Sequence, residues 1–192
     1  MGIHASLLAE VRACTRCADL PLGPNPILQF HPEARILIAG QAPGRRVHQS
    51  GVPFDDASGR RLREWLGMHP EVFYDPRKVA ILPMGFCYPG TGKSGDLPPR
   101  PECAAAWRAR LLEGLPRLET TLVLGQYAQR YHFGAAAGSL TDLVRAWRDP
   151  WPRLVPLPHP SPRNTLWLRR HPWFEAEVLP ALRAMLAEVL AR

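Results

Sequence analysis

The sequence has no apolar run of the roughly 18 to 20 residues that a helix needs to cross a bilayer. Its N-terminus also lacks the long apolar core of a signal peptide, so we expect a cytoplasmic protein with no membrane partner. Its 192 residues contain no polar low-complexity tract, internal repeat or linker-like segment. Because a chain of this length can bury a sizeable core, we expect a single domain over residues 1–192.

A complete phosphate-binding loop is also absent, although "GTGKS" at 90–94 looks like the end of one. The pattern G-x-x-x-x-G-K-S/T requires its first glycine five residues before Gly92, and the chain has Cys87 there. The segment continues into "GDLPPRPE", whose prolines and glycine prevent the helix that a phosphate-binding loop must enter. The sequence therefore argues against a nucleotide hydrolase.

Cysteine is scarce, and the four cysteines present suit a metal site better than disulfides. Cys14 and Cys17 form a C-x-x-C pair, which in a reducing cytoplasm favours metal binding when two further cysteines follow. Those two, Cys87 and Cys103, flank a loop rich in proline and glycine, of the kind that wraps a ligand. Four thiolates accept either zinc or an iron-sulfur cluster, and the residues alone leave both open.

Positive charge exceeds negative charge, since 24 lysines and arginines against 17 aspartates and glutamates give a formal net charge of +7. Nearly all of the basic residues are arginine, whose guanidinium suits bidentate contacts to phosphate. This excess is consistent with a polyanionic partner such as nucleic acid, and equally with a generally basic surface.

Short apolar runs alternate with helical patterns along the chain. We expect strands at 34–40, 78–84, 120–125 and 153–159. We expect an N-terminal helix before a proline-rich lead-in within 1–33, and further helices at 58–67, 101–114, 126–132, 139–148 and from Trp173 onward, with a kink or interruption at Pro180. This alternation predicts the α/β class, with a parallel sheet covered by helices on both faces.

Ligands of open parallel sheets bind beyond the carboxyl ends of the strands, so the segments that follow the predicted strands are candidate site loops. They read "GQAPGRRVHQSGVPFDD", "GFCYPGTGKSGD", "GQYAQ" and "HPSPRN" in chain order. Each is rich in glycine, proline or polar residues, and we expect all four to meet around one pocket.

The pairing of "GQAPG" and "GVPF" after the first strand, together with "HPSPRN" after the last, resembles the uracil-DNA glycosylase superfamily. The cysteine pattern is similar to that of its iron-sulfur branch, often called its fourth family, which has C-x-x-C near the N-terminus and two later cysteines sixteen residues apart, as Cys87 and Cys103 are. "HPSPRN" is more similar to the closing motif of the single-strand-selective branch. The resemblance implies a three-layer α/β/α sandwich around a four-stranded parallel sheet. It also implies a 4Fe-4S cluster, held by the four cysteines away from the reacting base.

The sequence departs from the iron-sulfur branch in two of its loops. Gln41 stands where that branch has a glutamate, and "RRVH" at 45–48 replaces its acidic stretch. Pro83 aligns with the asparagine that reads the Watson-Crick edge of uracil. The usual carboxylates and the usual base-reading amide are therefore absent at their expected positions.

The resemblance assigns base recognition and leaving-group stabilisation to the first and last loops. A DNA glycosylase extrudes the nucleotide, stacks its base and stabilises the charge that departs with it. Phe54 is the candidate stacking platform, although a phenylalanine here equally suits the core. The backbone amides of Gln41 and Ala42 are candidate donors to a base carbonyl. His159, oriented by Pro160, is the candidate donor to the pyrimidine O2.

Residues beside the pocket are candidates for holding DNA. Ser161 is suited to bind a phosphate, and Arg163 with Asn164 to form a wedge or backbone clamp next to the extruded base. Arg45 is a further candidate contact. The plainer alternative for Arg163 is a solvated loop arginine.

Three side chains are candidates for activating the water, namely Asp56, Asp55 and His48. In an extended "PFDD", alternation puts Asp56 on the face of Phe54 and Asp55 on the other, so Asp56 ranks first. Asp56 equally suits the N-cap of a helix that begins near Ser58. His48 is the second candidate base.

Two functions remain open at this stage. The first is a monofunctional DNA N-glycosylase that excises uracil or a related deaminated base by hydrolysis and leaves an abasic site. The second is a damage-binding or abasic-site-binding protein of the same fold with little catalytic activity. The absent carboxylates favour the second, and the presence of His159 and Phe54 favours the first. In the first case we expect a monomer whose partner is DNA that contains uracil or a deaminated base.

Overall fold

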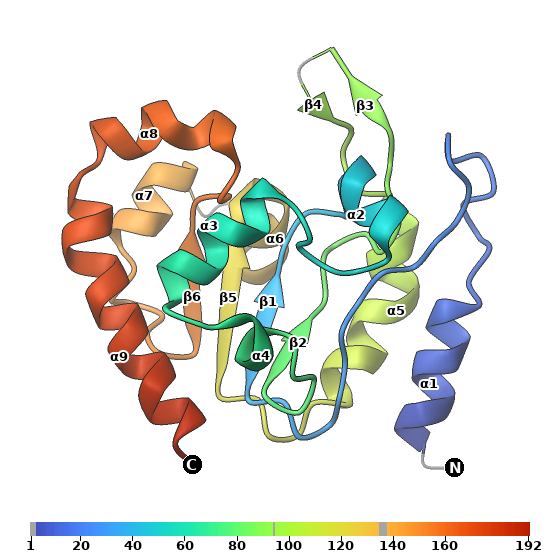
Figure 1. Ribbon diagram of the computed structural model, residues 1–192, viewed down its shortest axis with the longest axis horizontal. Helices are drawn as coiled ribbons and strands as arrows, with labels where there is room; N and C mark the ends of the chain where they lie inside the picture. The colour runs from blue at the N-terminus through green and yellow to red at the C-terminus, as the bar shows by residue number, and fades with distance from the viewer. Residues whose placement is uncertain (1–2, 94, 135–137) are drawn as a thin grey trace.

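A four-stranded sheet forms the centre of the computed structural model, which describes residues 3–93, 95–134 and 138–192 (Figure 1). Its strands run parallel in the order β2-β1-β5-β6. Their bounds are Ile36–Ala39 (β1), Val79–Ile81 (β2), Thr120–Leu124 (β5) and Leu154–Leu157 (β6). All four lie inside the ranges predicted from the sequence, and the parallel sheet is confirmed.

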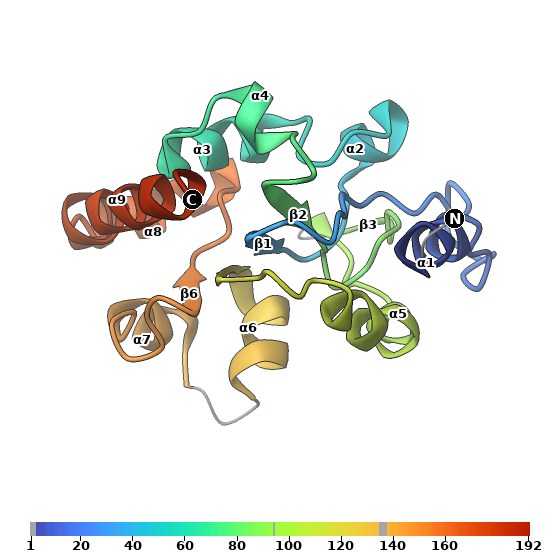
Figure 2. The same cartoon turned by 90° about the horizontal axis from the view of Figure 1, so that it is seen from below.

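Helices cover both faces of this sheet, as the sequence predicts (Figure 2). On one face lie α3 (Ala57–Leu66), α4 (Pro70–Phe73) and α9 (Leu179–Leu190). On the other lie α5 (Pro101–Glu113), α6 (Gly125–Phe133) and α7 (Leu140–Arg145), and α1 (Ile3–Arg12) lies beside α5. The architecture is therefore an α/β/α sandwich. Within the described residues, no helix is both long enough and apolar enough to cross a membrane.

The sheet separates two main hydrophobic clusters because successive side chains of a strand point to opposite faces. Ile36 and Ile38 of β1 lie in the cluster that α3 and α9 complete, whereas Leu37 lies in the cluster that α1 and α5 complete. With both faces covered, nearly every strand residue is buried. This explains why the strands read as continuous apolar runs in the sequence.

The C-terminal helical segment changes character close to Pro180, as predicted. Residues Phe174–Val178 form a wider π-helical turn (η2), and α9 begins directly before the proline. Proline has no N–H to donate to the carbonyl four residues earlier, so a regular α-helix does not pass through it undisturbed. The predicted interruption is thus confirmed as a local change of helix type.

Several short elements lie outside the helices and strands that the sequence predicts, and three of them fall in segments expected to be loops. Besides α4, they are α2 (Arg45–Ser50), the 3₁₀ turn η1 (Pro162–Asn164), α8 (Thr165–Arg170) and a hairpin of β3 (Thr91–Gly92) with β4 (Gly95–Asp96). Each is too short to show a helical or strand period in the sequence. Gly51 ends α2 in the left-handed region at φ 71°, where its N–H donates to the Val47 carbonyl.

Candidate active site

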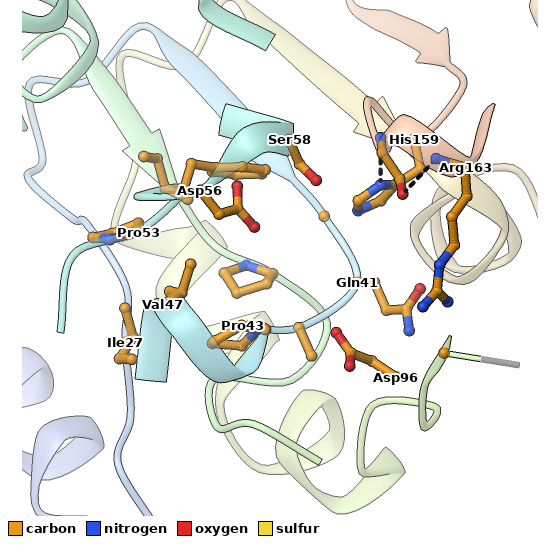
Figure 3. A pocket seen from close by; sticks show the side chains of 18 of the residues that line it. Ile27, Gln41, Pro43, Val47, Pro53, Asp56, Ser58, Asp96, His159 and Arg163 are labelled. Carbon is orange, nitrogen blue, oxygen red and sulfur yellow. Dashed lines mark hydrogen bonds between the residues drawn. The ribbon is translucent and has the colours of Figure 1, made fainter. Parts of the chain in front are cut away.

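The loops that follow the four parallel strands meet around one cavity of about 500 Å³ (Figure 3). Its volume falls within the range of about 300 to 1,000 Å³ typical of small-molecule sites. The predicted site residues that line it are Gln41, Ala42, Phe54, Asp56, His159, Ser161, Arg163 and Asn164. The prediction that the four loops converge is confirmed, and the contacts of each side chain indicate what it can do there.

Phe54 occupies a strained backbone position beside the cavity. Its φ of 57° lies in the left-handed region, which a bulky residue rarely adopts. Gly59 approaches so closely that a Cβ there would stand 1.7 Å from the Phe54 carbonyl oxygen, and Arg63 Nη1 donates to that oxygen at 3.4 Å. Strain of this kind persists only where the surroundings enforce it, and it is concentrated at functional sites.

The Phe54 ring belongs to the cavity wall and to the core at once. It stands edge-on to Phe73, with ring centroids 6.1 Å apart. The far end of the Phe54 ring lies close to the Gly40 backbone, where a Cβ would stand 3.5 Å from it. Both interpretations of Phe54 from the sequence therefore agree with its contacts.

Asp56 lines the cavity and also caps a helix. Its Oδ1 accepts a 2.8 Å hydrogen bond from the Gly59 N–H, which makes Asp56 the N-cap of α3. The extended "PFDD" that ranked Asp56 above Asp55 is wrong, because the backbone turns at Phe54. Asp56 nonetheless faces the cavity, whereas Asp55 is not among its lining residues.

His159 is fixed just beyond β6 by two local hydrogen bonds. Its Nδ1 accepts from the Ser161 N–H at 3.2 Å, and its carbonyl accepts from Asn164 Nδ2 at 2.7 Å. Because Nδ1 is an acceptor, the neutral ring carries its proton on Nε2. Burial lowers the pKa of His159, although the negative charges of Asp56 and Asp96 oppose that shift. The ring is therefore a neutral N–H donor near neutral pH.

Ser161 and Arg163 connect the last loop to its neighbours. Ser161 Oγ accepts from the Arg163 N–H at 3.2 Å, and the Ser161 carbonyl accepts from Arg61 Nη1 at 2.9 Å. The Arg163 guanidinium lies against Gly95, where a Cβ would stand 1.7 Å from Nη1. The arginine thus reaches from the loop after β6 to the β3–β4 hairpin.

Two candidate residues, His48 and Arg45, are not among the residues that line the cavity. Both belong to α2, which turns Val47 into the lining instead. Adjacent helical residues point about 100° apart, and the His48 ring lies 6.1 Å from the ring of Tyr88. In the described part of the chain, the buried Nδ1 of His48 has no hydrogen-bond partner. The structure therefore does not bring His48 together with Asp56 and His159.

Sequence reasoning missed three polar residues of the cavity, Ser58 at the start of α3, Asp96 and Gln126. Asp96 ends the candidate loop "GFCYPGTGKSGD", and Gln126 is the second residue of "GQYAQ". Composition identified these loops as candidates, but only the hairpin and the start of α6 determine which side chains face inward. The Gln41 side chain is also held in place, since its Nε2 donates to the Leu97 carbonyl at 3.3 Å.

This fold and this cavity correspond to a known family. The family model of the uracil DNA glycosylase superfamily matches residues 28–183. The chain belongs to this superfamily. The matched region contains all four strands and the loops of the cavity, so the resemblance seen in the sequence is confirmed at the level of the superfamily. Superfamily membership relates the chain to DNA glycosylases, hydrolases that cut the bond between a base and its sugar.

In this superfamily member, a second and smaller cavity is lined by the four cysteines, Cys14, Cys17, Cys87 and Cys103. The Phe86 N–H donates to Cys103 Sγ at 3.3 Å. Burial raises the pKa of the Cys103 thiol to about 12, and the other three cysteines add to that rise. Among the residues that the structure describes, no three His, Cys, Asp or Glu side chains are grouped closely enough to hold one metal ion. The four cysteines nonetheless share one cavity.

Proposed function

We propose that the chain is a monofunctional DNA glycosylase that hydrolyses the N-glycosidic bond of uracil, or of a related deaminated base, and leaves an abasic site. The orientation of His159 is the observation that carries this proposal. The Ser161 N–H on Nδ1 leaves the proton of the neutral ring on Nε2, beside the cavity. A fixed neutral donor of this kind stabilises the negative charge that departs with the base.

The cavity also offers groups that suit an extruded base. The backbone N–H groups of Gln41 and Ala42 make no hydrogen bond to another described residue, so they are free to donate to a base carbonyl. The Phe54 ring offers a flat apolar wall for stacking. Pro83 has no side-chain amide to read the base. The side-chain amides that line the cavity are those of Gln41, Gln126 and Asn164, and Asn164 donates to the His159 carbonyl.

DNA as the partner is supported by the basic residues near this cavity. Arg163 lines the cavity, and Arg45 and Arg46 are exposed on α2, the helix that follows the first cavity loop. Guanidinium groups make strong contacts to phosphate but carry no sequence information by themselves. The net charge of +7 favours the approach of a polyanion.

We propose that the four cysteines hold a 4Fe-4S cluster, the group implied by their resemblance to the iron-sulfur branch, with zinc as the alternative for four thiolates. All four side chains line one cavity, and a cluster of this kind is bound by four cysteine thiolates. The contact from the Phe86 N–H to Cys103 Sγ is of the kind that tunes such clusters. The cluster would link the N-terminal segment to the loop after β2.

The alternative function is binding of damaged or abasic DNA with little catalysis. It is favoured by Gln41 and by the basic "RRVH" segment, which remove the usual carboxylates from the first loop.

Incubation with uracil-containing single-stranded and duplex oligonucleotides, followed by alkaline cleavage of abasic sites, distinguishes the two functions. We expect alkali-labile sites with the wild type and far fewer with His159→Ala. DNA that is bound but stays alkali-stable with the wild type would favour the binding protein.

A further inference from the structure

The β3–β4 hairpin carries a carboxylate into the candidate active site. Asp96 of β4 lines the cavity, although it enters from a different loop than Asp56 or His159. The negative charges of Asp56 and Asp96 both act on the His159 ring, so all three groups lie within electrostatic reach of one another. Figure 3 shows the two carboxylates turned toward the space between them.

Two hydroxyl groups of the hairpin segment hold Asp96 in place. Its Oδ1 accepts from Thr91 Oγ1 at 3.3 Å, and Thr91 Oγ1 lies 2.5 Å from the Tyr88 hydroxyl. The Arg163 side chain lies against the adjacent Gly95. These contacts orient Asp96 through Oδ1 and leave Oδ2 toward the cavity.

Gly44 marks the space that the two carboxylates share. A Cβ at this residue would stand 3.4 Å from Asp96 Oδ2 and 4.0 Å from Asp56 Oδ2. Its φ of −77° is open to any residue, and these distances are ordinary contacts, so an alanine can stand here against both carboxylates. The two Oδ2 atoms therefore face one region beside Gly44, where a water molecule can lie between the carboxylates.

We propose that Asp96 is a catalytic residue that accepts a proton from the attacking water, with Asp56 as a second acceptor for the same water. This assignment rests on the proposed glycosylase function. The water oxygen bonds to the sugar C1′ as the bond from C1′ to the base nitrogen breaks, and the bonding electrons leave with the base toward His159 Nε2–H. One water proton passes to Asp96 Oδ2 and then to the departed base or to solvent. The net reaction consumes one water and yields a free base and an abasic sugar.

Asp96 is better suited than Asp56 to take this proton. Asp56 Oδ1 is engaged by the Gly59 N–H and anchors the start of α3. Asp96 is bound by a hydroxyl group of its own hairpin, and no backbone N–H among the described residues donates to it. It supplies, from the second loop, the acidic group that the first loop lacks at Gln41.

Single-turnover cleavage of a uracil-containing single-stranded oligonucleotide by Asp96→Asn tests this assignment, with Asp149→Asn as the matched control. Asp149 is exposed, precedes β6 and lies outside the cavity, and its substitution changes the net charge equally. We expect Asp96→Asn to slow the chemical step by about 10²-fold, the lower end for general acid–base catalysis. DNA affinity should stay equal or rise, because a negative charge near the phosphates is removed.

Two further variants separate a chemical role of Asp96 from a structural one. Asp96→Ala should regain part of its activity when sodium formate is added, whereas sodium chloride at the same ionic strength should restore none. Gly44→Ala places a methyl group against the space between the two carboxylates and leaves both intact. We expect it to slow cleavage with unchanged DNA affinity and melting temperature.

The outcomes distinguish this assignment from the function on which it rests. If the wild type is active and Asp96→Asn cleaves no more slowly than Asp149→Asn, the role of Asp96 is overturned and the proposed function stands. A wild type that leaves uracil in the DNA overturns the proposed function, and the role of Asp96 with it. Slow cleavage by Asp96→Asn with normal or tighter DNA binding, together with rescue of Asp96→Ala by formate, supports both the role of Asp96 and the proposed function.

Discussion

The two cavities of this protein differ in character, although one segment contributes to both. The larger cavity has polar groups from four loops, among them His159, Asp56 and Asp96, and each keeps an atom toward open space. The smaller cavity has four thiols beside apolar side chains such as Phe86 and Trp107. Polar groups that line an open cavity can act on a substrate, whereas four half-buried thiols that share a small cavity suit a bound metal centre that stabilises the fold. The first cavity is thus suited to chemistry and the second to stability.

The segment after β2 connects the two cavities. Pro83 lines the larger cavity, Phe86 and Cys87 line the smaller one, and Asp96 returns to the larger one. A cluster bound at Cys87 and Cys103 would therefore hold both ends of a segment that reaches the candidate active site. We therefore expect substitutions of the cysteines to lower the stability of the fold more than the cleavage rate. We expect substitutions of the polar residues to lower the cleavage rate more than the stability.

The largest effect is expected at the cysteine cavity. Cys103→Ser should cost several kcal/mol of unfolding free energy, because structural metal binding is coupled to folding. Iron and sulfide analysis, visible absorbance and thermal melting measure the effect. His159→Ala is the control, and it should keep the brown colour and melting temperature of the wild type. A colourless wild type that contains zinc would contradict the cluster.

The next largest effect concerns the departing base. His159→Ala should slow single-turnover cleavage by about 10² to 10³-fold, the range for loss of one donor to a developing negative charge. DNA binding should persist, because phosphate contacts lie on other residues. His31→Ala, a histidine outside the cavity lining, is the matched control. An Asp56→Asn variant impaired far beyond His159→Ala would make that carboxylate the principal catalyst instead.

DNA binding should weaken with salt by a smaller factor. The logarithm of the association constant should fall against the logarithm of salt concentration with a slope of about −0.9 for each phosphate contacted on duplex. Arg163→Ala should make that slope less steep by about 0.9, which corresponds to the loss of one phosphate contact. Fluorescence anisotropy titrations at several salt concentrations measure the slope. A binding constant that is unchanged between low and physiological salt would exclude DNA as the partner.

Asp56 contributes to both chemistry and stability, because it lines the larger cavity and also caps α3. Asp56→Ala should lose about 1 kcal/mol of unfolding free energy, whereas Asp56→Asn should keep most of it, since asparagine is an equally good N-cap. Chemical denaturation of the two variants measures the difference. Equal stability of the two variants would mean that the hydrogen bond from the Gly59 N–H contributes little.

The smallest effect is expected for pH near neutrality. Because the pKa of His159 is lowered from 6.5, its ring stays neutral as the pH falls from about 8 to 6.5, and the cleavage rate should stay constant. At still lower pH the ring gains a proton on Nδ1, which opposes the Ser161 N–H and releases the ring, so the rate falls. A single-turnover pH profile that already declines between pH 8 and 6.5 would contradict a neutral His159.

The sheet and the position of the cavity were predictable from sequence because their causes are local. Runs such as "ARILIAG" and "TTLVLG" are apolar throughout, which follows from burial on both faces. Glycine, proline and polar residues after each strand predicted the loops at the carboxyl edge. His159 was a candidate because it directly follows the last predicted strand and begins "HPSPRN", a motif that carries the resemblance to the superfamily.

Other parts of the site depend on contacts between distant segments, which local patterns do not encode. The left-handed conformation of Phe54 is imposed by Gly59 and Arg63, so the expected alternation of "PFDD" fails. The short helix α2 turns His48 out of the cavity lining, and a six-residue helix shows too few periods to be seen. Asp96 reaches the cavity through a hairpin whose strands consist of two residues each.

The most direct test of the central claim is to quantify free base and abasic sites together in a single-turnover reaction of the wild type on uracil-containing DNA. Our interpretation predicts that free uracil and alkali-labile sites appear in equal amounts, that the strand stays intact before alkali, and that His159→Ala slows both products alike. Tight binding of the same DNA without release of uracil would contradict it and identify the cavity as a site for recognition alone.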